Sequence, residues 1–164
     1  MIAVHRVEQF FGHVRASVSP AEMAMARGAL PEAAWPLFAA MPVADRRHAL
    51  DVMARLTASG VDDADVIVAA LLHDAAKGHR MRLWHRVAGV LLDAVAPSQL
   101  RRLASPDARS WRYPFYLYLH HSELSAEAAA AAGCSGRAAG FIRGVADEPD
   151  ASLLAALAIA DEAS

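Results

Sequence analysis

The chain has 164 residues, of which 55% are hydrophobic and 7% aromatic, and its formal net charge is −2 at pH 7. This length suits one domain with a substantial core, and the near-neutral charge excludes an overall electrostatic preference for nucleic acid polymers. The single cysteine, Cys134, excludes an internal disulfide and favours a reducing, cytoplasmic setting. No apolar run approaches the roughly 18 residues of a membrane span, and we find no signal-peptide pattern.

The alanine-rich, aromatic-poor composition favours packed helices over strands. Apolar residues at helical spacing predict a first helix over 3–17. Helix-start and helix-stop signals then divide the rest of the chain. We predict helices over 20–28, 31–41, 46–59, 80–95, 97–104, 114–121, 123–132, 135–146 and 150–161, and a further helix that is capped by Asp62 or Asp63 and runs to 76. Asp45 is predicted to be the N-cap of the 46–59 helix. No segment alternates with period two for long enough to predict a strand.

The chain shows no internal repeat and no low-complexity linker, so no domain boundary is predicted. We therefore expect a single all-α domain over 1–164, built as a compact bundle of many helices. Residues 1–41 are expected to form a helical N-terminal extension packed on it.

The most informative segment is the apolar run 66–72, which His73 and Asp74 follow directly. The run predicts burial, and a buried carboxylate is costly unless a partner compensates its charge. A divalent cation is one such partner, because it binds neutral imidazole and ionised carboxylate together. Lys77, one turn further on, is the only lysine in the chain.

Two further candidates for a metal site lie on other predicted helices. His48 belongs to the 46–59 helix and Asp161 ends the last helix, and apolar residues flank both. Helical proteins build metal sites from ligands on separate helices that face a common interior. Two imidazoles and two carboxylates suit one divalent ion such as manganese, iron, nickel, zinc or magnesium.

The order of these residues resembles the HD-domain superfamily of metal-dependent phosphohydrolases. His48, then His73-Asp74 with the following Lys77, then a distal Asp161 match the order of that family's motifs, and residues 121–127 are similar to its His-Pro-Glu-x-Gly-Ala stretch. The central motif departs from the family pattern at 75–76, where two alanines replace an isoleucine or valine and a glycine. The resemblance covers about 42–164.

The resemblance implies a role for each of these residues. His48, His73, Asp74 and Asp161 would bind the metal, and Asp74 and Lys77 would be the catalytic residues. Lys77 would bind a phosphate oxygen and stabilise the charge that develops during reaction; alternatively, it is a cation that interacts with the helix C-terminus. The family's further histidines for a second metal are missing from 141–148, so one metal is expected.

Four other basic residues are candidates for substrate binding. The resemblance implies that His121 contacts the substrate phosphate or supports a metal ligand, and that His85 contacts substrate or metal; alternatively, His85 is an ordinary core or surface histidine. Of the neighbours His120 and His121 only one is expected to face the site. Arg82 and Arg86 offer guanidinium groups that suit phosphate, although solvated surface charges are the commoner outcome at such spacing. The aromatic segment 111–116 indicates either a surface on which bases stack or, as is more common for such segments, part of the core or of a pocket wall beside His121.

These features lead to one expected function and two alternatives. The first is a metal-dependent phosphohydrolase that acts on a small phosphorylated molecule, expected to be a nucleotide, through water activated by the metal. The second is a catalytically silent HD-type domain that binds a nucleotide or a partner protein. The third is a scaffold in which His73 and Asp74 form only a buried pair. We expect neither a nucleic acid polymer nor a membrane as partner, and the sequence leaves a homo-oligomer open.

Overall fold

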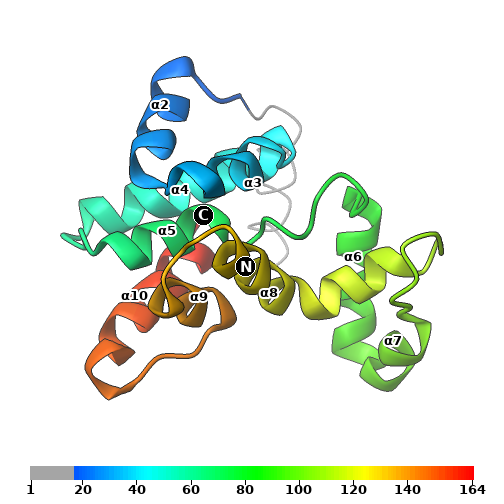
Figure 1. Cartoon of the computed structure of the whole chain (residues 1–164). Coiled ribbons are helices and arrows are strands. Elements are labelled where there is room, and N and C mark those ends of the chain that lie inside the picture. The colour runs from blue at the N-terminus through cyan, green and yellow to red at the C-terminus, as the bar shows by residue number, and fades with distance from the viewer. Residues whose placement is uncertain (1–16) are drawn as a thin grey trace.

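The computed structural model describes residues 17–164, and this range contains helices and connections without a strand (Figure 1). The prediction of an all-α fold is confirmed, whereas the helix predicted over 3–17 lies almost entirely outside the described residues. None of the described helices is both long and apolar enough to cross a bilayer. The α-helices are α2 (Pro20–Ala29), α3 (Trp35–Ala39), α4 (Val43–Ala58), α5 (Ala64–Leu72), α6 (Leu83–Val95), α7 (Pro97–Leu103), α8 (Tyr113–Ala131), α9 (Gly136–Arg143) and α10 (Ala151–Glu162), with 3₁₀ turns η1 (Glu32–Ala34) and η2 (Glu148–Asp150).

Helix α5 lies at the centre of the described fold. Val66, Ala69 and Leu72 have no exposed surface, and the Asp63 side chain caps the helix by accepting hydrogen bonds from the first backbone N–H groups. Helices α4 and α9 make the most extensive contacts with α5, and α2, α3, α8 and α10 also touch it. Because α5 is buried on nearly all sides, polar groups at its C-terminal end must find their partners on these neighbouring helices.

Helix α8 joins a main body to a smaller lobe. Figure 1 shows α6 and α7 beside the N-terminal part of α8, away from α5, α9 and α10, which lie around its other end. The sequence predicted two helices here, over 114–121 and 123–132, but the structure has one helix of 19 residues. Ser125 is buried within this helix, and its Oγ accepts a hydrogen bond from the backbone N–H of Ala76 in the turn that follows α5.

Asp45 is not the N-cap that the sequence predicted. Helix α4 begins at Val43, two residues before Asp45, so Asp45 lies inside its first turn. The Asp45 side chain is almost fully buried. Its carboxylate accepts a hydrogen bond from Nη2 of Arg86 on α6 at 2.7 Å. An aspartate near a helix start resembles a cap in sequence, whereas here its partner is a distant arginine.

The close approach of α6 to α8 depends on Gly89. A Cβ atom at this position would lie 2.6 Å from Cδ2 of the Tyr118 ring. We expect Gly89→Ala to lower the Tm, because overpacking costs about 1–3 kcal/mol and outweighs the gain in helix propensity. Gly28→Ala, where a Cβ meets nothing within 4 Å, is the matched control and should leave the Tm unchanged or raise it slightly. Thermal unfolding followed by circular dichroism checks both, and equal Tm values for the two variants would contradict the account.

Candidate metal centre

His73 and Asp74 lie directly after the last residue of α5. The sequence predicted a helix to residue 76, but α5 ends at Leu72. The Leu72 carbonyl accepts from the N–H of Ala75 at 3.0 Å, and the N–H of Ala76 donates to Oγ of Ser125 at 3.0 Å. In a continuing α-helix the N–H of Ala76 would donate to the carbonyl of Leu72. Here it donates to the buried Ser125 of α8 instead, and the chain leaves the helical path.

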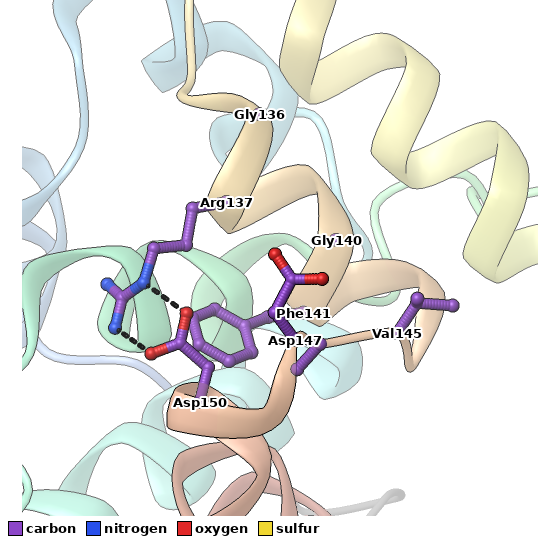
Figure 2. Close-up of a pocket in the computed structure, with 8 residues that line it drawn as sticks. Gly136, Arg137, Gly140, Phe141, Val145, Asp147 and Asp150 are labelled. Carbon is purple, nitrogen blue, oxygen red and sulfur yellow. Dashed lines mark hydrogen bonds and ion pairs between the residues drawn. The ribbon is translucent and has the colours of Figure 1, made fainter.

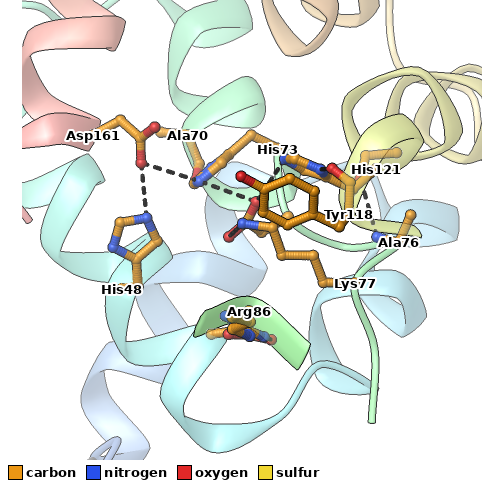
Figure 3. Close-up of polar contacts among 12 residues, drawn as sticks. His48, Ala70, His73, Ala76, Lys77, Arg86, Tyr118, His121 and Asp161 are labelled. Carbon is orange, nitrogen blue, oxygen red and sulfur yellow. Dashed lines mark hydrogen bonds and ion pairs between the residues drawn. The ribbon is translucent and has the colours of Figure 1, made fainter. Parts of the chain in front are cut away.

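Backbone carbonyls fix the orientation of two imidazole rings (Figure 3). Nδ1 of His73 lies 3.0 Å from the carbonyl oxygen of Ala70, and Nδ1 of His121 lies 2.9 Å from that of Tyr118. A carbonyl only accepts, so each Nδ1 carries the proton and donates. In the neutral ring, Nε2 is then the lone-pair atom, which is the tautomer that a metal ligand needs.

The four predicted ligands come together from three parts of the chain. Nε2 of His48, on α4, lies 2.8 Å from Oδ1 of Asp161, on α10. Nε2 of His73 lies 3.4 Å from the same Oδ1 and 3.6 Å from Oδ1 of Asp74. His48, His73 and Asp74 each offer an atom to a group that spans no more than 4.8 Å. Two adjacent ligand atoms that are each about 2.1 Å from one ion lie about 3.0–3.4 Å apart. The distance from His73 to Asp161 falls in this range and the other two lie just outside it, so the arrangement is close to that of a cation site.

Two of these atoms have no hydrogen bond among the described residues, although both are buried. They are Nε2 of His73 and Oδ1 of Asp74. A buried acceptor without a partner costs about 1–3 kcal/mol, and more when it is charged. A divalent cation would displace the proton from His73 Nε2 and bind both atoms, so the residues present fit a metal ion.

The charges of these groups also favour a cation. Burial alone would lower the pKa of His73, but the negative charges of Asp74 and Asp161 outweigh it and raise the pKa to about 8. Burial favours the neutral form of Asp74, yet His73 and Lys77 hold its pKa well below the usual range. Asp161, hydrogen-bonded by His48 and close to His73, also has a lowered pKa despite partial burial. Two ionised carboxylates therefore face the imidazoles at neutral pH.

Lys77 contacts the second oxygen of Asp74. Its Nζ lies 2.7 Å from Oδ2, and its side chain is 19% exposed. Asp74 thus presents Oδ1 to the histidines and Oδ2 to the lysine. The ion pair fixes the carboxylate and offsets part of the cost of burying it.

A cavity of about 220 Å³ opens beside these groups. Its polar side is formed by His73, Asp74, Lys77, His121 and Asp161, and its other walls include Ile142 and Leu157. Sequence reasoning missed two polar residues that line it, Ser122 and Arg143. Nε of Arg143 donates to Oε1 of Glu123 at 2.9 Å, whereas its Nη atoms donate to no described residue. Its position depends on how α9 packs on α8, and no local sequence pattern encodes that.

The structure separates the other predicted substrate contacts. Nε2 of His121 lies 3.8 Å from Oδ1 of Asp74, and His120 instead packs on Tyr116, as expected for neighbours on a helix. His85, Arg82 and Arg86 do not line the cavity.

These three residues have roles around α6 instead. Nδ1 of His85 accepts from the backbone N–H of Arg82 at 3.1 Å, at the start of α6. Arg86 pairs with the buried Asp45. In the aromatic segment 111–116, Phe115 is buried, as expected for a core residue. Trp111 is 66% exposed and is neither a core residue nor part of the cavity wall.

A second cavity, of about 330 Å³, lies beside α9 (Figure 2). Arg137 forms two parallel hydrogen bonds with Asp150, at 2.7 and 2.8 Å, and its Nη1 reaches Asp63 and Asp65. The guanidinium therefore has acidic partners on α5, its N-cap and η2. We interpret this cluster as a structural link between the start of α5 and the segment before α10.

The Arg137 cluster predicts a pH dependence of stability. Hydrogen bonds from Arg137 lower the pKa of both Asp63 and Asp150. Such carboxyls stabilise the fold above their unfolded pKa of about 3.9 and lose that contribution as the pH falls through the folded-state pKa. We expect Arg137→Met to lower the Tm at neutral pH and to flatten the fall in Tm between about pH 4 and about pH 2.

The control for this prediction is Arg55→Met, at an exposed position of α4 without an ion pair among the described residues. It should keep the wild-type dependence of Tm on pH. If Tm fell equally in the two variants between about pH 4 and about pH 2, the proposed role of Arg137 would be contradicted.

Comparisons of this chain with models of protein families, with curated proteins and with solved structures find no match.

Proposed function

We propose that the protein is a metal-dependent phosphohydrolase of the HD type that acts on a small phosphorylated molecule. The observation that carries this proposal is a pair of buried atoms that have no hydrogen bond among the described residues, His73 Nε2 and Asp74 Oδ1. They lie 3.6 Å apart, and Oδ1 of Asp161 lies 3.4 Å from His73 Nε2. This donor set suits manganese, iron, nickel or zinc better than calcium, which prefers oxygen ligands alone.

The residues around the cavity would have two roles, which are to orient the metal ligands and to contact the substrate. His48, His73, Asp74 and Asp161 would hold a divalent cation, which when bound would act as a Lewis acid that acidifies water and offsets phosphate charge. The carbonyl of Ala70 holds the His73 ring, and Lys77 holds Asp74, each in the orientation that ligation requires. Lys77, which lines the cavity, would contact a phosphate oxygen through its Nζ. His121 also lines the cavity, and its Nε2 lone pair would accept a hydrogen bond from substrate or water.

The size of the cavity bears on the substrate. About 220 Å³ is below the roughly 300–1,000 Å³ of sites that enclose a drug-sized ligand. The cavity therefore suits a phosphate group and a small adjoining part, with Ile142 and Leu157 against its apolar side. For a nucleotide, we propose that the base extends beyond the cavity.

Arg143 is the second cation in this cavity, and Glu123 holds its Nε. We expect Arg143→Met to raise KM for a phosphorylated substrate by about 10–100-fold, the loss of one charged hydrogen bond, while metal content stays unchanged. Steady-state kinetics with added manganese measure this, and Arg55→Met is the matched control. An unchanged KM would exclude Arg143 from substrate binding.

Turnover of a panel of phosphomonoesters and nucleotides with added manganese tests the proposed function. The proposal predicts hydrolysis that a chelator abolishes and that metal restores. Metal binding without turnover of any panel member would instead favour the silent binding domain, which the departures from the family motif at 75–76 also allow.

A further inference from the structure

The outer face of α6 is apolar and exposed. Trp84, Val87, Leu91 and Val95 are 53, 49, 59 and 80% exposed, and their spacing places them on one side of the helix. A groove of about 600 Å³ runs along this face, lined by Arg82, Leu83, Trp84, Val87, Ala88 and Leu91. Asp93 lies about 180° around the helix from Trp84, so this face carries no acidic residue of α6.

The other side of α6 is held firmly against the rest of the molecule. Gly89 allows the backbone to approach the Tyr118 ring too closely for any side chain, and Arg86 pairs with the buried Asp45. The His85 ring lies 3.6 Å from that of Trp84 and 5.8 Å from that of Phe115. The exposed face is therefore a fixed surface, which a partner can bind without first ordering it.

The apolar area matches what a stable dimer buries. Trp111, 66% exposed, extends the patch, because its ring and that of Trp84 both lie against Phe115 at 6.5 and 6.2 Å. The exposed parts of these five residues sum to on the order of 500 Å² per chain, if a whole aromatic side chain has about 200 Å². A homodimer interface of about 800 Å² per partner that is about 65% apolar contributes a similar apolar area.

We propose that this α6 face, defined by Trp84, Val87, Leu91, Val95 and Trp111, is the interface of a two-fold homodimer. A two-fold axis near Val87 and Ala88 would set the two α6 helices antiparallel, with Trp84 of each chain near Leu91 of the partner subunit. The same apolar patch then meets itself, which is the requirement of an isologous interface. This proposal does not depend on the metal centre.

Sedimentation equilibrium of the full chain tests the proposal over about 1 to about 100 µM, where a micromolar interface dissociates. At the highest concentration we expect the mass of wild type to approach twice the chain mass of 17.5 kDa, whereas Leu91→Glu should keep the monomer mass throughout. Met25→Glu, at a 58% exposed position on α2, is the matched control and should stay dimeric. The far-ultraviolet circular dichroism of all three should coincide.

A second variant tests the geometry directly. Val87→Cys places a thiol near the proposed axis, and mild oxidation should link two chains, whereas Met25→Cys should not. A wild type that stays monomeric throughout the concentration range would overturn the proposal. A dimer that Leu91→Glu leaves intact would overturn it as well.

Discussion

Replacing Asp74 by asparagine is expected to abolish metal-dependent turnover and to remove the stabilisation that metal gives. Asparagine keeps the size of the side chain but loses the charge that faces His73 at 3.6 Å and pairs with Lys77 at 2.7 Å. With free metal at 100 times its Kd, binding stabilises the folded state by about 2.7 kcal/mol. For a chain of this length that is a rise in Tm of roughly 5–10 °C, which the Asp74→Asn variant should lack.

Thermal unfolding with and without manganese, run beside the hydrolysis assay, measures both effects. His79→Ala is a useful control because this exposed histidine is near in sequence but does not line the cavity. It should retain turnover and the metal-dependent rise in Tm. Full activity in Asp74→Asn would contradict the proposed site.

Arg86→Met is expected to be the most destabilising of the charge substitutions. Asp45 has a side chain that is 2% exposed, and Arg86 supplies its ion pair from α6. Removing one partner of a buried pair costs about 3–5 kcal/mol, because the remaining charge stays buried and unpaired. The effect is large for a domain whose total stability is about 5–15 kcal/mol.

Urea unfolding gives the free energy of unfolding for this comparison. The double variant Asp45→Leu/Arg86→Met removes both charges and should recover most of the loss. Arg55→Met should stay within about 0.5 kcal/mol of wild type, as surface substitutions do. If the single and double variants were equally destabilised, the cost would come from lost packing rather than from the unpaired carboxylate.

Local patterns predicted the parts of this fold that depend on neighbours in sequence. The apolar run before His73 predicted a buried helix, and α5 is buried almost throughout. His48 and Asp161 lie 113 positions apart, and periodicity alone does not join them. The order of motifs placed them in one site, and the structure brings their side chains to 2.8 Å.

The features that sequence reasoning missed depend on distant partners. In the sequence Asp45 resembles a helix cap, but in the structure it pairs with Arg86 of α6. Ser125 of α8 accepts a hydrogen bond from Ala76 in the turn after α5, and Arg143 enters the cavity because α9 packs on α8. In each case the deciding contact joins residues far apart in the chain, about which propensity and periodicity carry no information.

The metal content of the purified protein, measured per chain by elemental analysis after incubation with manganese and removal of free ion, tests the central claim most directly. We expect about one divalent ion per chain, because His48, His73 and Asp74 form one group that could hold an ion, with Asp161 beside it. A chain that holds no metal under these conditions would contradict it, and His73 and Asp74 would then form only a buried pair.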